Sequence, residues 1–379
     1  MMQKRKRVVH MTTVHHPYDP RIYYKQCLSL KKAGFDVTLI AQGDTNDQRV
    51  KSVNHIRLKK YQSRIKRMLF GVFSAYKEAK KLQADIYHFH DPELLIVGWL
   101  LKKKDNIVIY DIHEDYVTSI LQKKYLPKVL RRFLASVYKL LEKWLTRKME
   151  LCLAEKYYQE IYPQGKCILN YPAYDQRLAH HQWDEQSVTN KLLYTGNVTE
   201  DRGALIHAAL PLLDEHLSVY FVGKCSSDLA EKMYDVAEHK HEQIIIEGID
   251  QFVKKERIEE MYMQHRWLAG IALFPPTEHY MRKELTKFFE YMVAGIPIIC
   301  SNFPVWKAFI DRYQCGIAVD PYNKDEIREA LHYLRTHPDQ AKQMGENGKR
   351  SVLNELNWYA EAKKLIQWYN ELMMSKHLS

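Results

Sequence analysis

Residues 271–304, IALFPPTEHYMRKELTKFFEYMVAGIPIICSNFP, decide the fold. Residues 271–274 are an apolar run that ends at a Pro-Pro pair, and residues 296–300 are a second apolar run. Between them, Thr286 is the expected N-cap of a short helix and Gly295 its expected stop. A helix that begins after a strand presents unpaired N–H groups and a positive dipole end. The stretch therefore predicts strand, loop, helix and strand, with a place to hold phosphate.

Lys287 and Glu290 lie three residues apart, on one face of that predicted helix. A nucleoside diphosphate needs such a pair, because a cation neutralises phosphate and a carboxylate accepts ribose hydroxyls. Spacing alone leaves a second interpretation open, in which the two side chains are a solvated pair on an amphipathic helix.

The segment also resembles the donor-binding segment of GT-B glycosyltransferases of family 4, through KFFEYMVAGIPIICSNFPVWKAFI and the later CGIAVDP. Residues 15–41, 84–95, 108–116 and 192–203 resemble that family too, in the family's order. The resemblance implies an α/β protein with two Rossmann-like domains facing across a cleft. It also implies retaining transfer of a sugar from a nucleotide-sugar, foremost a UDP-sugar, with Glu290 on the ribose.

The length and the pattern agree with two domains. The chain has 379 residues, enough for two cores. Short β-rich runs alternate with helical patterns, which predicts parallel sheets, and the pattern restarts near residue 192. The predicted strands are 7–13, 36–41, 86–89, 107–112, 151–154 and 166–169, and then 192–195, 219–222, 244–247, 269–274, 297–300 and 317–319. We expect an acceptor-binding domain at 1–172 and a nucleotide-sugar domain at 173–357, with a helix at 358–379 that packs back on the first domain, as the family's terminal helix does.

Charge is distributed unevenly along the chain. Residues 1–172 hold 33 Lys and Arg against 16 Asp and Glu, a net of +17, whereas the remainder holds 24 against 30, a net of −6. The first domain should therefore face an anionic partner. No nucleic-acid-binding motif accompanies the charge, so we expect an anionic membrane surface rather than nucleic acid.

Residues 126–149 predict a basic amphipathic helix. Its apolar stripe is either the core face of the domain or a surface for anionic lipid, and the pattern leaves both open. The longest apolar run, residues 94–101, is too short to span a bilayer. We expect a cytoplasmic protein, peripheral on the inner face of the cell membrane, with a lipid-linked or polysaccharide acceptor.

In the first domain the candidate site residues are His113 and Arg21. His113 follows the predicted strand 107–112, and the resemblance places it beside the transferred sugar. Arg21 would lie in the first turn of a helix capped by Asp19 and face the cleft, with a purely local cap as the alternative. Glu114 and Asp115 are a less favoured acid/base pair, because adjacent side chains point apart.

In the second domain, Arg202 stands at a strand-to-helix turn, where its guanidinium can clamp a diphosphate together with Lys287. The expected donor-binding residues also include Gly196, Asn197, Gly248, Ile249 and Thr286. Gly248 and Ile249 would contact the base, from a loop after residue 247.

Two departures from the family pattern leave the donor sugar open. Asn197 stands where relatives often carry Arg, and Arg282 stands where they carry an earlier Glu. These departures are the best support for one alternative, a non-catalytic protein that binds anionic surfaces and has a degenerate site. A nucleotide-sugar epimerase shares the fold and is the other alternative, but the sequence has no convincing set of carboxylates for proton abstraction.

His88, His90 and Asp91 resemble a metal cluster. His88 and His90 would share one face of a strand, but no further ligand joins these two at convincing spacing. The resemblance implies that basic residues and helix dipoles neutralise the diphosphate without metal, so we expect no metal and no cofactor.

Overall fold

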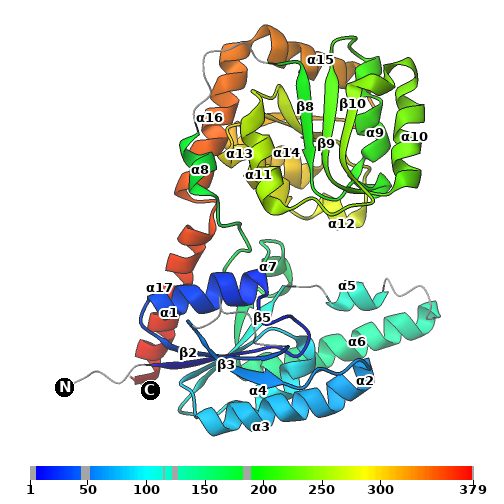
Figure 1. The fold of residues 1–379 in the computed structure, drawn as a ribbon. Helices are drawn as coiled ribbons and strands as arrows, with labels where there is room; N and C mark the ends of the chain where they lie inside the picture. Colours follow the sequence, from blue (N-terminus) through cyan, green and yellow to red (C-terminus); the bar gives the residue numbers. More distant parts are fainter. Residues whose placement is uncertain (1–5, 44–51, 114–115, 122–126, 182–188, 378–379) are drawn as a thin grey trace. The chain divides into compact units, whose positions relative to one another are not determined.

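The structure, a computed structural model, describes residues 6–43, 52–113, 116–121, 127–181 and 189–377. The chain forms two units, Met1–Asn170 with Trp358–Ser379, and Tyr171–Asn357. The first boundary lies two residues before the expected one. Each unit is a parallel sheet with helices on its faces (Figure 1).

The sheet of the first unit has seven strands in the order β3-β2-β1-β4-β5-β6-β7. They are β1 Arg7–Met11, β2 Asp36–Gln42, β3 Asn54–Leu58, β4 Ile86–Phe89, β5 Ile107–Ile112, β6 Glu150–Leu153 and β7 Lys166–Cys167. Sequence reasoning missed β3 alone. This edge strand is half-exposed and reads Asn-His-Ile-Arg-Leu, so it lacks the apolar run that marks the strands buried on both faces.

Two apolar cores lie on opposite faces of this sheet, because neighbouring residues of a strand point to opposite sides. Val8 enters one core and Val9 enters the other. The helices of this unit are η1 Pro20–Cys27, α1 Leu28–Lys32, α2 Arg64–Lys66, η3 Arg67–Gly71, α3 Val72–Leu82, η4 Pro92–Leu94, α4 Leu95–Leu101, α5 Tyr116–Leu121, α6 Lys128–Leu145, η5 Thr146–Lys148, α7 Tyr158–Ile161 and α17 Trp358–His377.

Helix α17 completes the first of these cores. Trp358, Leu365 and Tyr369 are buried in it beside residues of β1, β2 and η1. The buried Glu361 accepts the backbone N–H of Leu169 at 2.8 Å. Helix α17 is therefore an integral part of the first unit.

The helix expected after Pro20 begins where predicted but has a different form. Asp19 is its N-cap and accepts the N–H groups of Arg21 and Ile22. The first eight residues, Pro20–Cys27, are a π-helix, and only Leu28–Lys32 is α-helical. π-helical turns are frequent at functional sites. This one places the Arg21 guanidinium against Asp111 of β5.

Helix α6 tests the core interpretation of the basic amphipathic stretch, whereas the lipid-surface interpretation stays a prediction. Only Ala135, Glu142 and Leu145 of its residues are buried. The described side chains of the predicted stripe are mostly exposed, including Phe133 at 63% and Leu141 at 52%, and Leu126 lies outside the described residues. The core interpretation is therefore wrong for most of the stripe.

The sheet of the second unit has six parallel strands in the order β10-β9-β8-β11-β12-β13. They are β8 Lys191–Thr195, β9 Ser218–Cys225, β10 Ile244–Ile249, β11 Ala269–Ala272, β12 Ile298–Ser301 and β13 Gly316–Val319, all predicted within a few residues. The helices are α8 Gln176–His180, η6 Glu200–Arg202, α9 Ala204–Ala208, η7 Leu210–Leu212, α10 Ser227–Ala237, η8 Glu238–Gln243, α11 Lys255–Gln264, α12 Glu278–Met281, α13 Thr286–Val293, α14 Pro304–Tyr313, α15 Lys324–Thr336 and α16 Pro338–Asn354.

Three buried histidines cluster at the first sheet, His10 and His88 within strands and His90 directly after β4. His10 of β1 pairs in register with His88 of β4, and His10 Nδ1 is 3.0 Å from His90 Nε2. Burial lowers the pKa of all three, His90 to about 3 despite the opposing attraction of Asp111. The folded unit therefore holds them neutral.

This cluster predicts a loss of stability in mild acid. In the unfolded chain each histidine binds a proton near pH 6.5, so its contribution is complete above that pH and is lost as pH falls. The free energy of unfolding should decrease by about 1.4 kcal/mol per group for each pH unit below 6.5. Denaturant unfolding at pH 7.5 and 5.5 measures this.

His88→Gln should make the dependence shallower, whereas a control at the exposed His216, His216→Gln, should not. Equal stability of the wild-type chain at the two pH values would contradict the assignment.

Candidate functional site

Lys287 lies at the carboxyl edge of β8, brought there by α13. Its Nζ donates to the carbonyl oxygen of Thr195 at 2.7 Å and lies 3.6 Å from the centroid of the Tyr194 ring. The side chain is only 8% exposed. Burial lowers the pKa of Lys287 to about 7, opposed by Glu290 and reinforced by Arg202. An anion bound at this edge would restore the full positive charge.

Glu290 lies one turn further along α13. Its Oε2 accepts from the Tyr262 hydroxyl at 3.0 Å, and that hydroxyl is 2.8 Å from Thr195 Oγ1. No hydrogen bond to Oε1 occurs among the described residues. The carboxylate is thus fixed on one oxygen, and the other oxygen can accept a ligand hydroxyl.

Arg202 ends the short turn η6 after β8. Its Nε donates to the Tyr280 hydroxyl at 3.1 Å, which donates to Asp201 at 2.9 Å. The next residue, Gly203, has φ +77°, and a Cβ there would collide with the carbonyl oxygen of Leu273. Glycine therefore lets this turn lie against the end of β11, with the half-buried guanidinium at the same edge as Lys287.

Gly196 and Asn197 form the turn between Thr195 and Arg202. Gly196 N donates to the Val222 carbonyl at 2.9 Å, and the Asn197 carbonyl accepts from the Tyr194 hydroxyl at 2.8 Å. The turn's backbone is therefore anchored to both β8 and β9.

Two expectations for this unit need correction. Gly248 and Ile249 do not lie in a loop but end β10, where the register with β9 shifts between Glu247 and Ile249. The N-cap of α13 is Leu285, without a side-chain hydrogen bond, and Thr286 is the first helical residue. The sequence signal misplaced the cap by one position because Thr is a strong N-cap former.

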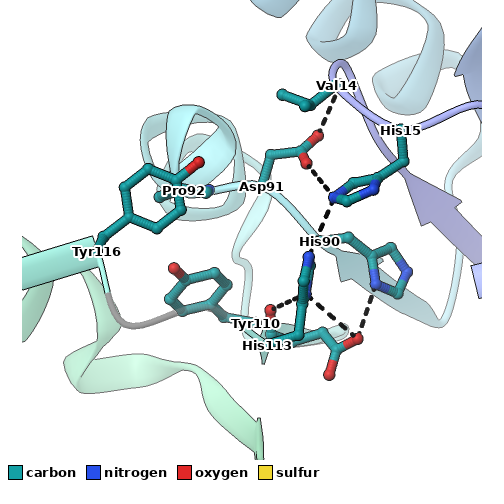
Figure 2. A pocket seen from close by; sticks show the side chains of 9 residues that line it. Val14, His15, His90, Asp91, Pro92, Tyr110, His113 and Tyr116 are labelled. Atoms are coloured by element: carbon teal, nitrogen blue, oxygen red, sulfur yellow. Dashed lines mark hydrogen bonds and ion pairs between the residues drawn. The ribbon is translucent and has the colours of Figure 1, made fainter. Parts of the chain in front are cut away.

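The first unit has a pocket at the carboxyl ends of β4 and β5 (Figure 2). His113 follows β5 there, and its Nε2 is 3.0 Å from Nε2 of His15. The Nδ1 atom of His113 is 3.3 Å from the carbonyl oxygen of Asp111. Burial lowers the pKa of His113, which outweighs the attraction of Asp111. The imidazole is therefore a neutral hydrogen-bonding group in the pocket.

Arg21 is not presented to a ligand, which corrects the expected donor contact. Its guanidinium is 5% exposed and binds Asp111 through two nitrogens, Nε at 2.9 Å and Nη2 at 2.7 Å. Nη2 also donates to the Ile168 carbonyl at 3.0 Å. Asp111 is buried, and a buried carboxylate needs a charged partner to be stable. Arg21 is that partner, so its guanidinium lies in the interior of the unit. Glu114 and Asp115 lie outside the described residues.

The cluster considered for a metal is assembled differently from the sequence prediction. Asp91 turns away and accepts from Thr12 and Thr13. Asp111 takes its place, and one atom each of His88, His90 and Asp111 lies within 4.8 Å of the others. The Asp111 oxygens already accept from Arg21, Gln26 and His90, so we interpret the group as a hydrogen-bonded cluster. The absence of a metal requirement stays a prediction.

Comparison with known proteins gives the family of each domain. Residues 20–155 match Glycosyltransferase Family 4, and residues 246–367 match the Glycosyl transferase-like family. No curated protein matches the sequence.

Three solved structures share the whole fold. Sucrose-phosphate synthase from Thermosynechococcus elongatus is 19% identical with a TM-score of 0.68, and the match covers 98% of this chain and 100% of that one. Anabaena HepE in complex with UDP is 10% identical with a TM-score of 0.69, covering 97% and 100%. WaaG, a glycosyltransferase involved in lipopolysaccharide biosynthesis, is 16% identical with a TM-score of 0.61, covering 95% and 98%.

These matches, with two parallel Rossmann-like sheets, define the class. The protein is a glycosyltransferase with the two-domain GT-B fold, and its first unit carries a Glycosyltransferase Family 4 domain.

Sequence reasoning missed the side chains that hold the site residues. Tyr262 and Tyr280 fix Glu290 and Arg202, and they come from α11 and α12, distant in sequence. Asp111 and His15 flank His113. The Asp-Ile-His order after an apolar run was a usable signal for Asp111, because a carboxylate inside a buried strand needs a partner.

Glu290→Ala should weaken UDP binding while the fold survives. A charged hydrogen bond to ribose contributes about 1.5–3 kcal/mol, which corresponds to about ten- to a hundredfold in Kd. Titration calorimetry measures the change, with Glu329→Ala, on the exposed face of α15, as the matched control. Equal affinity of Glu290→Ala and the control would remove Glu290 from the site.

Proposed function

We propose that the protein transfers a sugar, with retention of anomeric configuration, from a UDP-sugar to an acceptor bound by the first unit. The observation that carries the proposal is the meeting of Arg202, Lys287 and Glu290 at one sheet edge of a glycosyltransferase domain. HepE, of the same fold, binds UDP.

In this mechanism Glu290 accepts the ribose hydroxyls and Arg202 and Lys287 hold the diphosphate. The bond between the anomeric carbon and the diphosphate oxygen breaks, and its electron pair leaves with the phosphate. The buried Lys287 and the half-buried Arg202 stabilise that growing charge. The acceptor oxygen bonds to the anomeric carbon on the same face, and its proton passes to the departing phosphate. The neutral His113 contacts the transferred sugar.

Incubation of the purified chain with a panel of UDP-sugars tests the proposal directly. Release of UDP with formation of a glycoside supports transfer. Conversion of the donor into its epimer would instead favour an epimerase, and tight UDP binding without turnover would favour a degenerate, non-catalytic site.

Arg202→Ala should lower kcat more than it weakens donor binding, because charge on the leaving diphosphate grows toward the transition state. We expect a loss on the order of a hundredfold in kcat, with KM changed only a few-fold. Arg328→Ala, which removes an exposed arginine paired with Asp325, is the control. A kcat within twofold of the wild-type value would refute this role for Arg202.

We also propose peripheral attachment to the inner face of the cell membrane, with a lipid-linked or polysaccharide acceptor. The support is an apolar outer surface on α2–α4 and α6, which lie on the same side of the first sheet (Figure 1). Its exposed side chains are Ile65, Met68, Leu69, Phe70, Phe73, Ile96, Trp99, Leu100, Val129, Leu130, Phe133, Leu134, Val137, Leu140, Leu141 and Trp144.

The charge of the surrounding surface suits anionic lipid. Lys128, Arg132, Lys139 and Lys143 are exposed on α6 among these apolar side chains. Trp99 and Trp144 stack with centroids 5.6 Å apart, joining α4 to α6. Within the described residues, no helix is both long and apolar enough to cross a bilayer. Apolar groups between cations are typical of interfacial binding.

Two sets of variants separate the apolar and electrostatic contributions to vesicle binding. Gln at Lys128, Arg132, Lys139 and Lys143 should remove about 1 kcal/mol per charge at low salt, and little at 1 M salt, where the Debye length is ~3 Å. Phe133→Gln with Leu140→Gln should weaken binding at both salt concentrations, because the lost burial is apolar.

Co-sedimentation with phosphatidylglycerol vesicles measures both effects. Phe252→Gln, at an 80% exposed site of the second unit, is the control. A wild-type chain that does not bind such vesicles at low salt would contradict membrane attachment.

A further inference from the structure

The imidazole of His15 is surrounded by hydrogen-bond acceptors at the edge of the first-unit pocket (Figure 2). Its Nδ1 lies 3.3 Å from Asp19 Oδ2, and its Nε2 lies 3.4 Å from Asp91 Oδ1. The same Nε2 is 3.0 Å from His113 Nε2. Each ring nitrogen of His15 thus faces a carboxylate.

Asp19 is an ionised acceptor at neutral pH. Burial alone would raise its pKa, but hydrogen bonds from His15 and from the backbone amides of Ile22 and Arg21 lower it to about 2. An ionised carboxylate only accepts hydrogen bonds. Nδ1 of His15 therefore carries a proton.

Asp91 presents its second oxygen to the other ring nitrogen. Its Oδ2 already accepts from Thr12 Oγ1 at 2.9 Å, Thr13 N at 2.6 Å and Val14 N at 3.2 Å. Burial raises the pKa of Asp91, and the neighbouring His15 and these donors oppose that shift. Three donors on one oxygen favour the ionised carboxylate, so Nε2 of His15 is also a donor.

The tautomer of His113 follows from its own hydrogen-bond partners. Its Nδ1 faces the carbonyl oxygen of Asp111 at 3.3 Å, which can only accept. The proton of a neutral His113 therefore lies on Nδ1, and its Nε2 lone pair is free to accept the His15 N–H.

We propose that Asp19 and Asp91 hold His15 as an imidazolium, and that His15 is a positioning residue for His113. The Nε2–H of His15 fixes the plane of the His113 ring and keeps His113 in the neutral tautomer protonated on Nδ1. The consequence for catalysis rests on the proposed function: His113 meets the transferred sugar as a hydrogen-bonding group and does not compete as a cation for the diphosphate.

The arrangement predicts an alkaline limit to activity. Among the described residues, the charged or titratable groups around the pair include Asp19 and Asp91 beside His15, Asp111, Arg21 and His90 beside His113, and Tyr110 and Tyr116 in the same pocket. When His15 loses a proton at high pH, one carboxylate loses its donor or His113 loses its hydrogen bond. Activity should fall as His15 deprotonates.

Nitrogen-15 NMR of histidine-labelled protein tests the protonation states without reference to activity. At pH 7 His15 should show two protonated nitrogens and His113 one, Nδ1, with assignments from His15→Gln and His113→Gln. Asp19→Asn removes the charge but keeps a side chain that can cap η1. It should lower the pH at which His15 deprotonates, whereas a control at the exposed neighbour, His16→Gln, should not. A neutral His15 at pH 7, or no shift in Asp19→Asn, would overturn the proposal.

Kinetics test the positioning role. His15→Gln should lower kcat by about ten- to a hundredfold, with the KM for the UDP-sugar nearly unchanged, since misplacing a group at the reaction centre costs that much. It should also abolish the alkaline limb that the wild-type chain and His16→Gln share.

The two measurements separate the two proposals. An imidazolium His15 in a chain without transfer activity would defeat the proposed function while leaving the state of the His15–His113 pair intact. An active chain whose pH profile is unaffected by His15→Gln would defeat the positioning role.

Discussion

The buried ion pair between Arg21 and Asp111 is the interaction on which the arrangement of the first unit depends. Asp111 is 1% exposed, and four donors reach it. Arg21 Nε, Arg21 Nη2 and Gln26 come from η1, and His90 comes from the residue after β4. A buried charge that loses its partner destabilises a protein by about 3–5 kcal/mol. The π-helix, the histidine cluster and the end of β5 are therefore held together, and His113 follows two residues after the carboxylate.

The second unit also holds its basic site residues in place, but in the described part of the chain no carboxylate bonds directly to them. Its cations are held by neutral partners: Lys287 by a backbone carbonyl and an aromatic ring, Arg202 by a tyrosine hydroxyl. Such partners orient the basic group without forming an ion pair, so it can bind an anion, which for Lys287 restores the charge that burial weakens. The first unit thus pairs its buried arginine with a carboxylate, whereas the second unit leaves Lys287 and Arg202 able to bind an anion at the sheet edge.

Much of the fold could be predicted because a parallel sheet buried on both faces needs continuous apolar runs, which the sequence displays. The edge strand β3 lacks such a run and was missed. Lys287, Glu290 and Arg202 could be selected from the sequence only because their spacing agrees with the resemblance to family 4, and their roles toward a donor stay predictions. The fate of Arg21 could not, since its partner Asp111 is ninety residues away and only the folded sheet brings them together. The exposed stripe of α6 was ambiguous for the same reason, because periodicity shows that a face is apolar but not what covers it.

The return of α17 to the first unit has a consequence for synthesis on the ribosome. The second unit is a continuous stretch of 187 residues, 171–357, and can fold as soon as it emerges. The first unit, although translated earlier, lacks Trp358, Leu365 and Tyr369 until that stretch has been made. During this interval an apolar face of its sheet stays uncovered, and the His88 ring lacks the Tyr369 hydroxyl that contacts its Nδ1 at 2.6 Å. The first unit is therefore completed after the second unit. Its uncovered apolar face is a surface that chaperones can bind until α17 has been made.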